Sequence, residues 1–153
     1  MSDFHALKIS EIKQVTPTSV AVTFEVPQAL KTIFSFIAGQ YITLNHTING
    51  ELVRRAYSIC SAPSSGLLTV GIKKVVNGTF SVYANEQLAV GDTIDVMPPQ
   101  GTFTHNPNSQ EAHHIAAFAA GSGITPILSI AQTALEQESN STFLLVYGNQ
   151  TKQ

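Results

Sequence analysis

The sequence predicts a mainly β protein, in which six short strands form an antiparallel barrel or sandwich and the beginning of an α/β unit follows. Residues 7–97 contain short alternating or β-branched segments that are separated by turn signals. From residue 113 the pattern changes. An apolar run is followed by a glycine-rich turn, then by apolar residues at helical spacing, and then by a second apolar run. With 43% apolar residues in 153, the chain can bury a sizeable core.

Six segments in the first part have the composition of strands. They are LKISEIKQV (7–15), SVAVTFEV (19–26), QYITLNHTI (40–48), ELVRRAYSI (51–59), LLTVGIKKV (67–75) and DTIDVMP (92–98). The pair Asn49-Gly50, between the third and fourth segments, is a strong signal for a two-residue hairpin. We expect Pro98-Pro99 to end the last strand. Residues 79–88 break the alternation, so we interpret them as a short helix.

The second part has a strand–helix–strand pattern. The apolar run HIAAFAA is typical of a buried parallel strand, and Pro126 suits the first turn of the helix after it. The run STFLLVYGN then predicts a second strand. The polar segment 105–112 separates the parts, which gives a first domain over residues 1–106 and a partial α/β domain over 107–153. One helix cannot cover both faces of such a sheet, so we expect a fragment of a longer protein or a homodimer.

Composition excludes several classes of function. Eight Lys+Arg against ten Asp+Glu give a net charge of −2, which does not favour nucleic acid or an anionic membrane. Glycine, proline and hydroxyl residues interrupt the longest apolar stretch, and no signal peptide is evident, so we expect a cytoplasmic protein. Cys60, the single cysteine, is expected in the core and cannot complete a Cys-ligated zinc or iron–sulfur site. The five histidines suggest no metal site, and we expect His113 and His114 to be surface or capping residues.

The segment RRAYS (54–58) has two interpretations. Strand alternation puts Arg55 and Tyr57 on one face, where the guanidinium can grip a phosphate while the ring lies against a flat ligand. The alternative is a solvated pair of arginines beside a core tyrosine. Ser58 lies on the opposite face of a regular strand, so it joins such a site only if the strand ends or bends there.

The segment GSGITP (121–126) also has two interpretations. A glycine-rich turn before a helix leaves free N–H groups for a phosphate at the positive end of the helix dipole. It lacks the third glycine of the dinucleotide fingerprint, and no acidic residue follows the second strand. The alternative is a tight turn without a ligand.

Four motifs in register carry a family resemblance. RAYS (55–58) matches the R-x-Y-S/T motif of the ferredoxin–NADP reductase-like flavoproteins, and three further segments follow in that family's order and spacing. These are GIKKVVNGTFSVY (71–83), VGDTIDVMPPQGTF (90–103) and AAGSGITPILSI (119–130), with LVYGNQT after them. The chain resembles this family, especially the reductases of bacterial oxygenase systems of the phenylacetyl-CoA epoxygenase type. The resemblance implies a six-stranded antiparallel Greek-key barrel that binds FAD, followed by the start of an NAD(P)H domain.

The resemblance also implies residue roles. Arg55 would pair with the FAD pyrophosphate, Tyr57 would pack on the isoalloxazine or ribityl group, and Ser58 would be the catalytic residue, hydrogen-bonded near flavin N5. Further cofactor contacts would come from Ala56, from Ile72 and Lys73, and from a helix start at Gly78, Thr79, Phe80 and Ser81. The nicotinamide nucleotide would meet Gly121, Ser122, Gly123, Ile124, Thr125 and Pro126. No metal ligand is implied.

The function implied by the resemblance is electron transfer from NADH or NADPH through FAD to an iron–sulfur centre of an oxygenase or ferredoxin-type acceptor. This chain has no four-cysteine segment for such a cluster. Gln150 stands where many relatives carry Arg, and the nucleotide half is short. The alternative is therefore a flavin-binding electron-transfer or regulatory subunit without turnover of its own.

Overall fold

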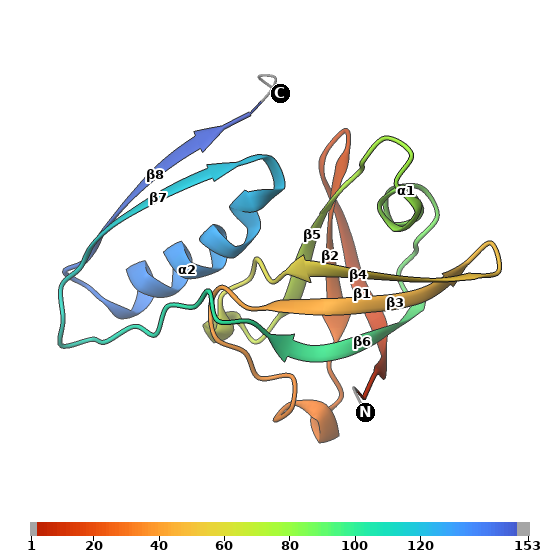
Figure 1. Cartoon of the computed structure of the whole chain (residues 1–153). Coiled ribbons are helices and arrows are strands. Elements are labelled where there is room, and N and C mark those ends of the chain that lie inside the picture. The colour runs from red at the N-terminus through yellow and green to blue at the C-terminus, as the bar shows by residue number, and fades with distance from the viewer. Residues whose placement is uncertain (1–2, 150–153) are drawn as a thin grey trace.

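The computed structural model describes residues 3–149, which form one antiparallel and one parallel sheet (Figure 1). The antiparallel sheet contains β1 (His5–Thr16), β2 (Ser19–Glu25), β3 (Tyr41–Ile48), β4 (Glu51–Ser58), β5 (Leu68–Lys73) and β6 (Thr93–Gln100). The parallel sheet contains β7 (His114–Ala120) and β8 (Thr142–Gly148). The α-helices are α1 (Thr79–Glu86) and α2 (Ile124–Gln137), and short 3-10 turns cover Gln28–Leu30, Pro63–Ser65 and Gly121–Gly123. Both helices expected from the sequence are thus present.

The six-stranded sheet closes on itself as a barrel. Its strand order is β4-β3-β6-β1-β2-β5, with β6 inserted between β3 and β1. Beyond the end of β4, Ile59 bridges Val70 and the Cys60 N–H donates to the carbonyl oxygen of Thr69 over 2.9 Å. These bonds join the two outer strands. The non-sequential order is of the Greek-key type, as the resemblance implies.

The β3–β4 hairpin follows from two residues of its turn. Asn49 and Gly50 both have positive φ, 52° and 83°, as a two-residue turn of type I′ requires. The ladder then runs without a break from the Ile48–Glu51 pair to the Tyr41–Ser58 pair. This register places Arg55 and Tyr57 at the end of the barrel remote from the turn.

The expected end of the sixth strand was wrong. Strand β6 continues through Pro98 and Pro99 to Gln100. Its pairing with β3 is irregular at this point, because the residue pairs on either side are Thr43–Met97 and Tyr41–Gln100. The β6 segment between these pairs is therefore one residue longer than the β3 segment opposite it. In such a bulge the missing N–H groups of proline remove no ladder bond, so the strand tolerates both prolines.

The barrel interior forms the hydrophobic core. Its buried side chains come from all six strands and from α1, with Phe34 and Ile59 contributed by the connections. They include Leu7, Ile9, Val20, Val22, Ile42, Leu44, Val70, Ile72, Phe80, Ile94 and Val96. Alternation along each strand supplies these positions, because every second side chain points inward.

Helix α2 lies between the parallel sheet and the barrel (Figure 1). The hydroxyl of Ser129 on this helix donates to the carbonyl oxygen of Ser61 in the barrel over 2.7 Å. The other face of the sheet carries Phe118, Leu144 and Val146, all exposed. Neither α-helix covers this second face, in agreement with the expectation from the sequence. Within residues 3–149, no helix is both long and apolar enough to cross a bilayer.

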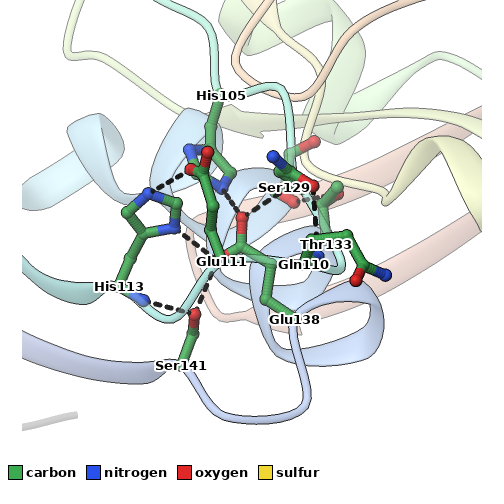
Figure 2. A network of polar contacts seen from close by, with 9 residues as sticks. His105, Gln110, Glu111, His113, Ser129, Thr133, Glu138 and Ser141 are labelled. Carbon is green, nitrogen blue, oxygen red and sulfur yellow. Dashed lines mark hydrogen bonds and ion pairs between the residues drawn. The ribbon is translucent and has the colours of Figure 1, made fainter.

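A buried carboxylate connects the segment before β7 to the end of α2. Glu138 is 1% exposed and accepts hydrogen bonds from the rings of His105 and His113, at 3.2 and 3.0 Å (Figure 2). The Asn108 N–H and the Ser141 hydroxyl also donate to it, at 3.0 and 2.7 Å. His113, which is partly exposed, therefore has a structural role in this network. Among the described residues, no His, Cys, Asp or Glu side chains form a group of three or more suited to a metal.

Candidate functional site

A cleft of about 780 Å³ between the barrel and the α/β unit brings together the three motifs that the sequence singled out. We call it the large cleft. The predicted residues that line it are Arg55, Ala56, Tyr57, Ser58, Lys73, Gly78, Thr79, Phe80, Ser81, Ser122, Gly123, Thr125 and Pro126. The strand, the helix start and the glycine-rich turn are far apart in sequence, so only the fold makes them one site.

The charge of the large cleft favours an anion. Arg55, Lys73 and Lys74 line it, and none of its lining residues is Asp or Glu. The chain holds only eight Lys+Arg and has a net charge of −2, so this concentration of positive charge is local. Lys74 pairs with Glu86 at 3.1 Å outside the lining, and the Arg55 guanidinium donates to the Arg54 carbonyl oxygen over 2.7 Å. Arg55 forms no ion pair within residues 3–149, so its charge remains free for a ligand.

The start of α1 offers main-chain donors to the same cleft. Its N-cap is Gly78, and no side chain caps the helix start, so N–H groups of the first turn are free for an acceptor. The Val75 N–H donates to the Ser81 hydroxyl oxygen over 3.1 Å, which fixes the loop that leads into the helix. A Cβ at Gly78 would collide with the Ser81 hydroxyl, so glycine is needed to let loop and helix approach.

Tyr57 and Phe80 form the apolar part of the site. Their ring centroids are 5.8 Å apart with an interplanar angle of 40°. Phe80 is 1% exposed, so its side chain belongs to the core and only its main chain is available to a cofactor. Tyr57 is half-buried, and this burial raises its pKa to about 12 although the nearby Arg55 charge opposes the shift. Its phenol is neutral over the whole physiological range and presents a flat, uncharged surface.

Ser58 lies at the end of strand β4, which is the condition that the sequence set for its joining the site. The next residue, Ile59, bridges Val70 of β5 while its N–H donates to the Gln40 carbonyl oxygen over 2.9 Å. Ser58 lines the large cleft together with Arg55 and Tyr57. Ala56, on the same face of the strand as Ser58, lines the cleft as well, so residues of both strand faces reach the site.

A second cleft of about 390 Å³ adjoins the first, and we call it the small cleft. Three predicted residues, Ile72, Gly121 and Ile124, line it and do not line the large cleft. Gly71, Lys73, Ser122 and Thr125 line both clefts. The site therefore consists of two neighbouring compartments that share a wall.

Sequence reasoning missed several residues that line the two clefts. Gly71, Lys74 and Val75 border the large cleft, and a wider reading of the segment 71–83 would have included them. Cys60, Leu128 and Tyr147 border the small cleft, where the Tyr147 hydroxyl donates to the Gly121 carbonyl oxygen over 2.9 Å. Cys60 is only partly buried, and burial raises its pKa, so it is an unreactive thiol at the edge of the core.

Two family models match the chain. Residues 6–105 match the model described as "Oxidoreductase FAD-binding domain", and residues 118–153 match "Oxidoreductase NAD-binding domain". These matches confirm FAD and a nicotinamide nucleotide as the cofactors that the resemblance implied. The geometry fits them, because a flat neutral ring, a guanidinium and a helix start meet in one cleft.

Individual relatives belong to oxygenase systems. The chain is 42% identical over 153 residues to a component of the 1,2-phenylacetyl-CoA epoxidase of Escherichia coli K12, covering 100% of this chain and 43% of that protein. It is 35% identical over 145 residues to the ferredoxin reductase component of 3-ketosteroid-9-alpha-monooxygenase of Rhodococcus rhodochrous, covering 94% of this chain and 40% of that protein.

Among solved structures, phthalate dioxygenase reductase superposes with a TM-score of 0.76 at 27% identity, over 97% of this chain and 44% of that one. That protein is described as a modular structure for electron transfer from pyridine nucleotides to a 2Fe–2S centre. The chain thus spans less than half the length of these relatives. Since the first family match covers well over half of the chain, the protein belongs to the oxidoreductase FAD-binding domain family.

Proposed function

We propose that this chain carries the FAD-binding barrel of an NAD(P)H-dependent oxidoreductase, which passes electrons to an iron–sulfur centre of an oxygenase or ferredoxin-type acceptor. One observation carries the proposal: Arg55 and the start of α1 line the same cation-rich cleft. The description of phthalate dioxygenase reductase, with electron transfer from pyridine nucleotides to a 2Fe–2S centre, supports the direction of electron flow. The division into a barrel domain at 1–106 and a nucleotide-binding part at 107–153 belongs to this proposal.

The diphosphate of FAD would be held by charge and by main-chain donors. The Arg55 fork suits two phosphate oxygens, and a charge-assisted hydrogen bond of this kind contributes about 1.5–3 kcal/mol. The N–H groups of Thr79, Phe80 and Ser81 at the start of α1 would face the same group. Without these groups, a dianion would lie against a largely apolar barrel end.

The ring system would lie between the barrel and the glycine-rich turn. Tyr57, neutral because of its high pKa, would pack against it, and Ala56 and the main chain of Lys73 would border it. The Ser58 hydroxyl would donate a hydrogen bond at the reacting edge of the flavin. Bound FAD supplies the redox chemistry, in which it accepts a hydride and releases single electrons, while the protein supplies position and charge.

The nicotinamide nucleotide would use the small cleft. The turn Gly121–Gly123 opens α2 and leaves main-chain N–H groups at the positive end of that helix. Ile124 would provide an apolar wall, the main chain of the buried Ile72 would border the same cleft, and Thr125 would lie at the boundary with the large cleft. Gly123 and Pro126, which were also expected to contact the nucleotide, line only the large cleft, so the nucleotide would reach the flavin there.

A flavin titration followed by anaerobic addition of NADH tests the proposal. The purified chain is expected to bind FAD, and NADH is expected to bleach the flavin absorption. Failure to take up FAD would contradict the whole proposal.

Uptake of FAD with a spectrum that NADH leaves unchanged would identify a flavin-binding electron-transfer or regulatory module instead.

The uncovered face of the β7–β8 sheet would pair with a second copy of the chain. Phe118 on this face is 76% exposed, and Leu144 and Val146 flank it. An apolar face of this kind is self-complementary in a two-fold dimer. Sedimentation of the wild type is expected to show a dimer, and Phe118→Asp is expected to show a monomer. A monomeric wild type would contradict this part of the proposal.

A further inference from the structure

Helix α2 contacts the barrel at several points along its length. Ser129 is 0% exposed and bonds to the Ser61 carbonyl oxygen, and one turn earlier Thr125 lies on the same face of the helix. Near the other end of the helix, the Ser64 hydroxyl donates to Glu136 over 2.5 Å. A Cβ at Gly39, in the segment before β3, would lie 3.1 Å from the Cδ1 atom of Ile130, so the helix contacts the barrel there as well.

At its N-terminal end, α2 meets strand β5 at a glycine. A Cβ added to Gly71 would lie 2.8 Å from the Cγ2 methyl of Thr125, which is shorter than two carbon atoms tolerate. The φ of Gly71 is not positive, so its backbone conformation would accept alanine. Space, not conformation, therefore requires glycine at this position.

This contact lies at the boundary between the two clefts. Gly71 and Thr125 line both the large and the small cleft. The Thr125 hydroxyl donates to the Ser122 carbonyl oxygen over 3.0 Å, so the same side chain also fixes the glycine-rich turn. A shift of Thr125 away from β5 would move the turn and change the separation of the two compartments.

We propose that Gly71 is a positioning residue, whose missing side chain lets Thr125 close on β5 and thereby sets the nicotinamide nucleotide against the flavin. The inference rests on the proposed function of the two clefts. It extends that function by assigning the alignment of the two ligands to one interatomic contact. Displacement of reacting groups by about 1 Å can reduce a transfer rate by about a hundredfold.

The substitution Gly71→Ala should separate the effects on the two ligands. FAD is held mainly by the barrel wall, through Arg55 and α1, so its dissociation constant should rise less than about threefold, an effect under ~0.7 kcal/mol. The nucleotide needs both walls of the small cleft. The dissociation constant for NAD⁺ or NADP⁺, measured as a perturbation of the flavin absorption spectrum, should rise at least about tenfold.

A second substitution makes the test specific. Thr125→Ser removes the Cγ2 methyl that would collide with the Cβ introduced by Gly71→Ala, and it keeps the hydroxyl that bonds to Ser122. The double variant Gly71→Ala/Thr125→Ser should therefore bind the nucleotide as well as Thr125→Ser alone does. Such non-additivity is expected only if the two side chains meet. Gly148→Ala is the matched control, because it adds the same methyl group where no atom lies within 4 Å and the φ is not positive.

The outcomes separate this inference from the proposed function. If the wild type takes up no FAD, the proposed function fails. If it takes up FAD and responds to neither NAD⁺ nor NADP⁺, the inference is overturned and the barrel assignment stands. The inference is also overturned if folded Gly71→Ala responds like Gly148→Ala, or if Thr125→Ser restores none of the lost nucleotide affinity. Thermal unfolding of each variant checks that the fold is intact.

Discussion

The fully buried hydroxyl of Ser129 on α2 donates a 2.7 Å hydrogen bond to the main-chain carbonyl oxygen of Ser61 in the barrel. Ser129→Ala would leave this carbonyl without its partner at a partly buried position. We expect the free energy of unfolding in urea to fall by about 1–3 kcal/mol. Ser64→Ala removes an exposed hydrogen bond between the same two parts and should cost less than about 0.5 kcal/mol. Equal losses in the two variants would contradict the importance of burial here.

Glu138 should make the free energy of unfolding depend on pH in the acidic range. Hydrogen bonds from Ser141 and from the Asn108 N–H lower its pKa from 4.5 to about 2, and the His113 ring adds to the effect. Because the folded value is the lower one, the contribution of Glu138 is complete above pH 4.5. It is lost as the pH falls toward about 2. Urea unfolding at a series of pH values measures this. Glu138→Gln should flatten the acidic limb, whereas the exposed Glu136→Gln should leave it unchanged.

His113 should make the free energy of unfolding fall as the pH rises, not as it falls. Its ring donates to Glu138 through Nδ1 at 3.0 Å, and its Nε2 lies 3.1 Å from Glu111. The bond to Glu138 raises its pKa above 6.5, with the charges of both carboxylates adding to the effect. The stabilisation is therefore complete below pH 6.5 and is lost as the pH rises through the raised value. We expect His113→Gln to remove the alkaline decline in unfolding free energy. A decline of unchanged size would contradict this role.

Gly78→Ala tests the loop that leads into α1. The backbone of Gly78, with φ −76° and ψ 126°, accepts alanine, but the new Cβ would collide with the Ser81 hydroxyl. Ser81 would then lose its bond from the Val75 N–H. We expect a loss of about 1–3 kcal/mol in unfolding free energy and weaker FAD binding in a fluorescence titration. Gly148→Ala, with open space around its Cβ, should behave as wild type.

Local signals in the sequence were sufficient for most elements of the fold. The alternating segments and the Asn49-Gly50 turn predicted the strands, and Pro126 predicted the start of helix α2. The continuation of β6 through Pro98 and Pro99 had no local signal, because it depends on a bulge opposite β3. The 62% exposure of Phe103 also had no local signal, since an aromatic side chain alone does not reveal what covers it.

The candidate site was harder to predict than the fold. Spacing alone did not show that RAYS, the α1 start and GSGITP would meet, and the family resemblance supplied that expectation. The contact of Gly71 with Thr125 and the enclosure of Glu138 by His105 and His113 join distant segments. Such contacts leave no periodic pattern in the sequence, so they became visible only in the structure.

The adjacent arginines provide a matched test of the cation in the large cleft. Arg55 lines the cleft, whereas the Arg54 guanidinium lies 4.7 Å from the centroid of the Phe4 ring on the opposite face of β4. Arg55→Ala should raise the dissociation constant for FAD about 10- to 100-fold, because a charge-assisted bond to the diphosphate is lost. Arg54→Ala removes the same charge from the chain and should change FAD affinity less than about twofold, which is under ~0.4 kcal/mol. Arg55→Lys should recover only part of the affinity, since an ammonium cannot bind two phosphate oxygens as a planar fork does. Equal losses for Arg54→Ala and Arg55→Ala would mean that general positive charge holds the cofactor and that the position of Arg55 in the cleft is irrelevant.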